Sequence, residues 1–159
     1  MDELLKLLTK NALESPENLA RLLNLSVQDV KDRIAAYEKK GVIRGYRAIV
    51  NEDQLQTNQV RAAIEVKITP EREGGFNRIA TRVSRFPEVE SVFLMSGGYD
   101  LLVFVSGPDL RTAAAFVSEK LATIEGVLST STHFMLKTYK DQGVLMEEEG
   151  EYERLKVSP

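Results

Sequence analysis

The sequence predicts an α+β protein with two domains, and three observations carry this prediction. Residues 1–50 show helical periodicity with strong cap residues, and residues 60–140 show strand and helix patterns that alternate and repeat. Between 89 and 105, two apolar runs rich in β-branched and aromatic residues are separated by Ser-Gly-Gly-Tyr-Asp. That arrangement is typical of a hairpin, because glycine allows the positive φ angles of a tight turn. The second domain is therefore expected to be built outward from this hairpin.

The composition fits an ordinary globular chain. It has 159 residues, of which 43% are hydrophobic and 28% are charged. It lacks both a run of about 18 apolar residues and a basic leader before an apolar core, so the sequence predicts a cytoplasmic protein with no membrane span. The absence of cysteine excludes disulfides and thiol catalysis and argues against a zinc site.

Charge is distributed unevenly along the chain, which carries a net −3. Residues 1–50 hold nine Lys/Arg and seven Asp/Glu, a net +2, whereas the remainder holds 12 basic and 17 acidic residues, a net −5. A mildly basic first third ahead of an acidic body is consistent with contact between that first third and phosphate.

Three helices are predicted in residues 1–50. The first spans 2–11, and the second begins at Ser15, a good N-cap that is followed by a proline. The third begins at Ser26, which can form a capping box with Asp29, and it ends at Gly41, a natural left-handed residue after a helix.

The second and third of these helices have the spacing of a helix-turn-helix. Val30, Ile34 and Tyr37 form the apolar stripe of the third helix, and its other faces are polar. Residues 42–50 follow as a β-rich segment with basic residues on alternate positions, as expected of a wing beside a DNA-reading helix. A plain three-helix bundle is the alternative.

Residues 51–59 are polar, without apolar periodicity, and are predicted to be a linker. Residues 60–140 then repeat a strand–helix–strand unit, giving the ferredoxin-like order βαββαβ, with both helices on one face of a four-stranded antiparallel sheet. The open face of the sheet predicts a homodimer. The expected strands are Val60–Ile68, Val89–Met95, Leu101–Val105 and Val127–Leu136, and the expected helix faces are Phe76, Ile79, Ala80 and Val83, then Leu110, Ala113, Ala114, Val117 and Leu121.

The remaining features predict little chemistry. Residues 141–159 are interpreted as an acidic tail, with a last strand over 151–157 as the alternative. The single histidine, His133, lies within a predicted strand, where a structural role is expected. With no metal-ligand cluster, nucleophile motif or paired carboxylates, the sequence predicts no enzyme, no metal site and no cofactor.

Four motifs in register resemble those of the leucine-responsive regulatory protein/asparagine-synthesis regulator (Lrp/AsnC) family. The first is the helix opened by Leu25-Ser26 with Arg33 inside it, and the second is the run 41–46. The third and fourth are Gly97-x-Tyr99-Asp100 between strands and Gly126-Val127 followed by Thr130-x-Thr132. The resemblance implies a winged helix-turn-helix transcription regulator that binds double-stranded DNA, dimerises through its ferredoxin-like domain and, in many members, forms octamers of four dimers.

The resemblance also implies two sets of site residues. The residues expected to contact DNA are Ser26, Val27, Gln28, Lys31, Arg33, Arg44 and Arg47. The residues expected to bind an effector, a small amino acid, are Gly97, Gly98, Tyr99, Asp100, Thr130 and Thr132. A carboxylate can accept from an ammonium, and glycine N–H groups and threonine hydroxyls can donate to a carboxylate, so this second set suits an amino acid.

Two alternatives stay open at this stage. The glycines and Asp100 can serve only to make and cap a turn. Asp32, at a position where the family commonly has a basic residue, sets a carboxylate among the expected DNA contacts, where phosphate repels it. The second functional hypothesis is therefore a metabolite-binding regulatory module with degenerate DNA binding that acts on a protein partner.

Overall fold

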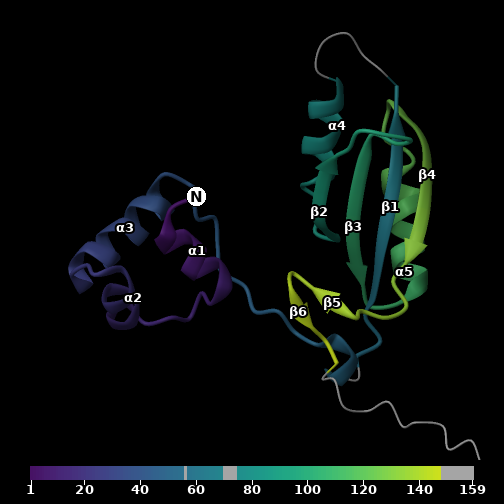
Figure 1. Cartoon of the computed structure of the whole chain (residues 1–159). Coiled ribbons are helices and arrows are strands. Elements are labelled where there is room, and N and C mark those ends of the chain that lie inside the picture. Colours follow the sequence, from purple (N-terminus) through teal and green to yellow (C-terminus); the bar gives the residue numbers. More distant parts are fainter. Residues whose placement is uncertain (56, 70–74, 148–159) are drawn as a thin grey trace, which may run out of the picture. The chain divides into compact units, whose positions relative to one another are not determined.

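The computed structural model describes residues 1–55, 57–69 and 75–147 (Figure 1). It divides into two compact units, with the boundary along the chain between Ile49 and Val50, and each is described by itself. In the described residues, no helix is both long and apolar enough to cross a bilayer.

The first unit is a bundle of three helices, α1 (Glu3–Lys10), α2 (Pro16–Leu23) and α3 (Val27–Lys39). All three were expected from the sequence. Its core is small and is made by one apolar stripe from each helix, because amphipathic helices bury the side that repeats every third or fourth residue. The buried residues are Leu4, Leu8, Leu19, Ala20 and Val30.

The expected helix caps are confirmed. The Ser15 hydroxyl accepts from the third residue of its helix at 3.1 Å. The Ser26 hydroxyl accepts from the Asp29 N–H at 3.0 Å, and the Asp29 carboxylate accepts from the Ser26 N–H at 3.3 Å, which completes a capping box. Gly41 has φ +69°, the left-handed conformation expected after α3.

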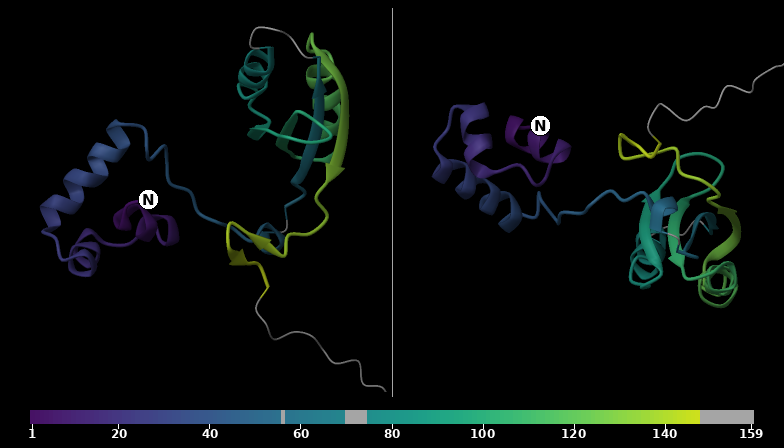
Figure 2. Two further views of the ribbon diagram at one scale, coloured as in Figure 1. Left: turned by 45° about the horizontal axis from the view of Figure 1, so that its top comes forward. Right: turned by 90° about the horizontal axis from the view of Figure 1, so that it is seen from below.

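The second unit contains a four-stranded antiparallel sheet in the order β2-β3-β1-β4. Figure 2 shows that α4 and α5 lie on the same side of it. The alternation expected for β1 is confirmed, because its even-numbered residues from Ala62 to Ile68 are buried. The elements are β1 (Val60–Ile68), α4 (Gly75–Val83), β2 (Val89–Leu94), β3 (Leu101–Gly107), α5 (Leu110–Ala115) and β4 (Val127–Phe134).

The helix after β3 differs from the expected one. After Ala115 it continues as a π-helix, η2 (Phe116–Leu121), and the Ala122 N–H bonds to the carbonyl five residues back. The wider turn rotates the apolar face, so that Phe116 is buried and packs edge-on against Phe86 with ring centroids 5.5 Å apart. Leu110 and Ala114, expected on the core face, are exposed.

The internal repeat is visible as two equivalent turns. The Val89 N–H bonds to the Phe86 carbonyl at 3.1 Å, and the Val127 N–H bonds to the Ile124 carbonyl at 3.0 Å. Each turn ends a helix and begins an outer strand of the sheet. The two strand–helix–strand halves therefore share this turn as well as their order.

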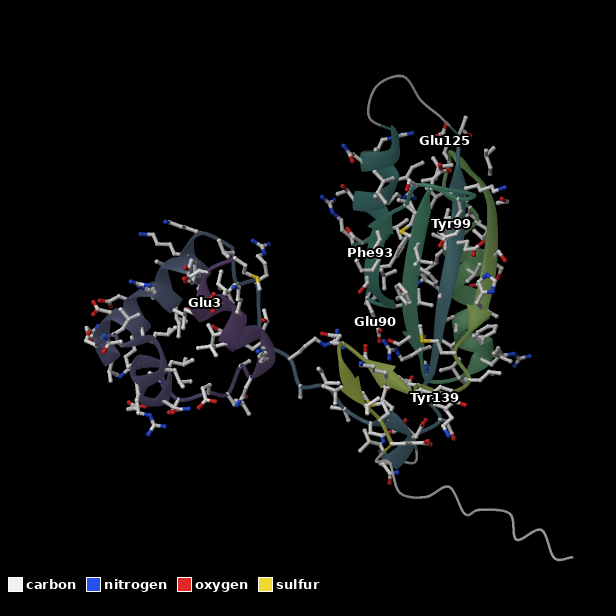
Figure 3. The ribbon with its side chains drawn as sticks, viewed as in Figure 1. Glu3, Glu90, Phe93, Tyr99, Glu125 and Tyr139 are labelled. Atoms are coloured by element: carbon white, nitrogen blue, oxygen red, sulfur yellow. The ribbon has the colours of Figure 1, made fainter. Side chains whose placement is uncertain are left out.

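The sheet face away from the helices is part apolar and part polar. Phe93 of β2 is 50% exposed and meets Phe104 of β3 edge-on at 6.0 Å (Figure 3). Toward β4 the same face carries Glu65 and His133, whose side chains are 3.5 Å apart. The expectation of an apolar face therefore applies to its β2–β3 side only.

The residues flanking the sheet are more ordered than the sequence predicted. In the expected linker, Glu52–Leu55 form a 3-10 helix, η1, and the Asn51 side chain donates to the Met146 carbonyl at 2.6 Å. In the expected tail, β5 (Lys140–Asp141) and β6 (Val144–Leu145) form a hairpin. The alternative strand over 151–157 lies outside the described residues.

Candidate DNA-binding face and effector turn

Helix α3 presents an exposed polar face opposite its buried stripe. Val30 is fully buried, whereas Gln28 and Asp32 are exposed. At roughly 100° per residue, Asp32 stands about 160° around the helix from Val30. Asp32 therefore marks the centre of the outward face.

The two cations expected to contact DNA flank this centre. Lys31 and Arg33 are both exposed and stand about 100° to either side of Asp32. Phosphate chains line both walls of the major groove, so a helix lying in it can place one cation toward each wall. The arrangement suits backbone contacts at the sides and base contacts in the middle.

Arg33 also interacts electrostatically within its own unit. The hydrogen bond from Tyr37 lowers the pKa of Asp2, and the charge of Arg33 adds to this lowering. The hydrogen bonds from Ser26 likewise lower the pKa of Asp29, with a smaller contribution from Arg33. No ion pair of Arg33 within 4.0 Å is formed in the described part of the chain.

The remaining α3 residues of the expected DNA set differ in exposure. Ser26 is exposed and committed to the capping box. Val27 is half-buried and packs against the core of the first unit, so it presents less surface than expected. Gln28 is exposed, and its amide donates to the Asp32 carboxylate at 2.8 Å.

The expected wing lacks strands. Residues 41–50 form no regular secondary structure, because a β-prone segment needs a partner strand and none pairs with it among the described residues. Its first residues still contact α3, because the Val42 and Ile43 N–H groups bond to the Tyr37 carbonyl at 2.9 and 3.2 Å. The Tyr46 hydroxyl donates to Glu38 at 3.0 Å, and the Arg44 guanidinium lies so close to Gly41 that an added Cβ there would come within 3.1 Å of it. Burial and the bond to Glu38 raise the pKa of Tyr46.

Arg44 and Arg47, the two wing residues of the expected DNA set, are exposed. They are therefore accessible to a ligand, and Arg44 is held near the end of α3 by its position over Gly41.

The turn between β2 and β3 is exposed and offers free donors. Gly97 has φ +141°, whereas Gly98 does not have a positive φ, so only the first of the two glycines needs its conformational freedom. A Cβ added at either glycine would meet nothing within 4 Å. Among the described residues, the N–H groups of Gly97, Gly98 and Tyr99 form no backbone hydrogen bond.

Asp100 fastens this turn to the neighbouring strand. Its carboxylate oxygen Oδ2 accepts from the Ile68 N–H at 2.8 Å, and its own N–H bonds to the Val66 carbonyl at 3.0 Å. The first bond falls where the pairing of β1 with β4 shifts register between Lys67 and Ile68. Asp100 therefore has a structural role, which ties the turn to β1, and its second oxygen, Oδ1, takes no part in that bond.

The two threonines of the expected effector set lie on β4, away from the turn. Thr130 pairs with Val66 and Thr132 pairs with Ile64, whose side chains are buried under the helices. Directly opposed residues share a face, so both threonines, half-buried, lie on the helix-covered face. Strand β1 separates them from Asp100, so a single chain does not bring the expected effector residues into one pocket.

A cavity of about 260 Å³ lies elsewhere in the second unit and was not predicted. It is lined by the linker, the start of β1, and the segment joining β4 to the terminal hairpin. Its walls include Asn51, Asp53, Arg61, Lys137 and Asp141. The hairpin beside it turns at Gln142-Gly143, where both φ angles are positive, and Gly143 is the sequence signal that could have located it.

The contacts around His133 do not form a catalytic relay. Both Glu65 and Ser131 approach the same ring nitrogen, Nε2, at 3.5 and 3.4 Å. A relay needs the carboxylate on one ring nitrogen and the hydroxyl on the other. No group of three or more metal-ligating side chains occurs in residues 1–55, 57–69 and 75–147.

Comparison with known families agrees with this division of the chain. A family model described as winged helix-turn-helix DNA-binding matches residues 3–44, and a model described as Lrp/AsnC ligand binding domain matches residues 61–145. A DNA-binding unit followed by a ligand-binding domain defines a transcription regulator, not an enzyme. The chain belongs to the Lrp/AsnC family.

Relatives match over nearly the whole chain. The HTH-type transcriptional regulator YugG of Bacillus subtilis is 42% identical over 158 residues, covering 99% of this chain and 95% of YugG. The proline dehydrogenase transcriptional activator of Rhodobacter capsulatus is 31% identical over 135 residues, covering 85% and 87%. The solved structure of the regulator NMB0573 from Neisseria meningitidis in complex with L-Met is 26% identical, covers 89% of this chain and 93% of that one, and superposes with a TM-score of 0.69.

Proposed function

We propose that this regulator binds double-stranded DNA sequence-specifically, with the outward face of α3 in the major groove. The observation that carries the proposal is the placement of Lys31 and Arg33 on opposite sides of an exposed polar face. Residues near the start of a recognition helix contact base edges, so base contact is assigned to Gln28. Ser26 supports this contact by capping the helix. Arg44 and Arg47 contact the backbone from the wing segment, and Val27 contributes through packing.

Salt dependence tests this assignment. Each cation that neutralises a phosphate releases counterions, so its loss lowers the slope of log affinity against log salt by about 0.9. Lys31→Ala and Arg33→Ala should each lower the slope by about that amount, measured by fluorescence anisotropy of the full chain on labelled operator DNA.

Lys6→Ala is the matched control, because Lys6 is an exposed lysine of the same unit that pairs with Glu3 on α1. Its slope should equal that of the wild type. If Lys31→Ala and Arg33→Ala both keep the wild-type slope while remaining folded, α3 does not face DNA. DNA binding that is absent altogether, with effector binding intact, favours the module that acts on a protein partner.

The effector of this protein is proposed to be an amino acid. The N–H groups of Gly97 and Gly98 suit its carboxylate, and the Asp100 oxygen Oδ1 suits its ammonium. Tyr99 adds a polar, half-buried side chain to the same turn. The relative from Neisseria meningitidis solved with L-Met supports this class of ligand.

A second copy of the chain is proposed to complete the site. Thr130 and Thr132 lie across β1 from the turn, so a lone chain does not close the proposed site around a ligand. The apolar side of the open sheet face, with Phe93 at its centre, provides a homodimer contact, and dimers assemble further into a tetramer of dimers. Because Thr130 and Thr132 lie on the helix-covered face, the contact between dimers, and not the one at Phe93, brings them to the site from β4.

A further inference from the structure

The outward face of α3 carries one hydrogen bond between its own side chains. The Gln28 amide nitrogen Nε2 donates to Asp32 Oδ1 at 2.8 Å. The two residues are four apart, which places them on the same face one turn from each other. Gln28 is the second residue of the helix, where base contact is expected, and Asp32 is the carboxylate that the family resemblance does not explain.

The chemistry of the pair fixes which way the Gln28 carboxamide points. A carboxamide has a donor end and an acceptor end, and without a partner it can turn either way. An ionised carboxylate only accepts, so Asp32 holds Gln28 by its NH₂ group alone. Within the described part of the chain, the Gln28 carbonyl oxygen and the second amide hydrogen have no other hydrogen-bond partner, so both are available to a base edge in a known order.

We propose that Asp32 is a positioning residue that orients Gln28 to read adenine in the major groove, an inference that rests on the proposed DNA-binding role of α3. Adenine presents an N6 amino donor beside an N7 acceptor, which matches the Gln28 oxygen and free N–H. Guanine presents O6 in place of N6–H₂, so the held carbonyl oxygen meets another acceptor and guanine is rejected.

The same carboxylate weakens contact with DNA of any sequence, because it lies between two walls of phosphate. Asp32 therefore lowers non-specific affinity while raising discrimination for adenine. Removing it should move these two quantities in opposite directions, which loss of a merely structural contact would not do.

The test uses the full chain and a duplex selected from a random pool by the wild-type protein. Each A·T pair of that duplex is replaced by G·C, one at a time, and the affinities are measured by competition anisotropy. A bidentate glutamine–adenine contact is worth about 1–3 kcal/mol, or a discrimination of roughly 5- to 150-fold. Gln28→Ala should abolish that factor at one A·T pair in each half-site.

Asp32→Asn should lower the same factor at the same base pair, because the asparagine amide can hold Gln28 in either orientation. It should also raise affinity for random-sequence duplex. Glu38→Gln is the matched control, because it removes one negative charge from α3 while its amide oxygen can still accept from Tyr46. That control should raise non-specific affinity without changing discrimination.

Two results would overturn the inference: unchanged adenine discrimination in Asp32→Asn, or unchanged base preference at every position in Gln28→Ala. If either result is found while Lys31→Ala still lowers the salt slope, the Gln28–Asp32 inference fails and the proposed DNA-binding face stands. If no α3 variant changes DNA binding at all, the proposed DNA-binding face fails with it.

Discussion

The two candidate sites of this chain differ in how much of each a single copy contains. The proposed DNA-binding face lies mainly on one helix, where Lys31, Asp32 and Arg33 stand in consecutive positions and Gln28 lies one turn before Asp32. The proposed effector residues lie on a turn at one side of β1 and on β4 at the other. A site on one helix depends on local geometry. A site spread over a sheet depends on how the strands pair and, we propose, on a second copy of the chain.

The largest expected effect comes from breaking the assembly. Phe93→Asp places a charge on the apolar side of the open sheet face, where Phe93 is half-exposed and is not needed for the core. Truncating a central aromatic contact costs about 2–4 kcal/mol, so self-association should weaken roughly 30- to 700-fold. Analytical ultracentrifugation of the full chain measures it.

Leu110→Asp serves as the control for Phe93→Asp. Leu110 is 55% exposed, but it lies on α5, on the helix-covered side of the sheet. It should leave the assembly unchanged. Equal weakening by both variants would show that any new charge disrupts the protein, and an unchanged Phe93→Asp assembly would remove the sheet face from the dimer contact.

A smaller effect is expected from the effector turn. Asp100→Asn keeps an oxygen that can accept from the Ile68 N–H but removes the charge offered to an ammonium. A hydrogen bond to a charged group is worth about 1.5–3 kcal/mol, so effector affinity should fall roughly 10- to 150-fold. Calorimetric titration measures the affinity, and a melting curve checks that the turn is kept. Unchanged affinity in a folded assembly would exclude the ammonium role.

Replacing each of the two glycines of the turn by alanine should change the melting temperature of the protein by different amounts. Gly97→Ala forces a side chain into φ +141°, at a cost of about 1–3 kcal/mol. Gly98→Ala has ordinary backbone geometry and open space around its Cβ, so the melting temperature should stay near that of the wild type. A lower effector affinity in Gly98→Ala alone would indicate that the ligand approaches that backbone closely. Equal melting temperatures for the two variants would contradict the assigned geometry.

The smallest effect concerns the cap of α3. Hydrogen bonds from Ser26 lower the pKa of Asp29, so the carboxylate stabilises the folded state above the ordinary Asp range and loses this effect as pH falls through its folded-state pKa. Asp29→Asn should therefore lower the melting temperature at neutral pH, and the difference from wild type should shrink in acid. A difference that does not change with pH would contradict the charged cap.

Local signals explain what the sequence could predict. The ends of α3 are set by Ser26, Asp29 and Gly41, and the alternation along β1 shows which of its residues are buried. Both features were predicted correctly because they depend only on residues close in the sequence. The repeated strand–helix–strand pattern predicted the sheet. Its two halves form similar turns, one at Phe86 and one at Ile124.

The remaining features depend on contacts between distant residues. The burial of Phe116 in the π-helix accompanies its packing against Phe86, 30 positions earlier in the chain. The bond of Asp100 to Ile68 joins residues 32 apart, at a register shift that no local pattern records. The missing wing strands have a related cause, because a strand is set by its partner and not by its own composition.

Effector titration of the Phe93→Asp variant tests most directly whether the effector site needs a second copy. The variant is titrated with the amino acid that binds the wild-type assembly, at a protein concentration where ultracentrifugation shows a monomer, and its salt slope on a single half-site duplex is measured in parallel. Effector binding should be lost while the salt slope per chain stays at the wild-type value. A folded monomer that binds the effector with wild-type affinity would contradict it.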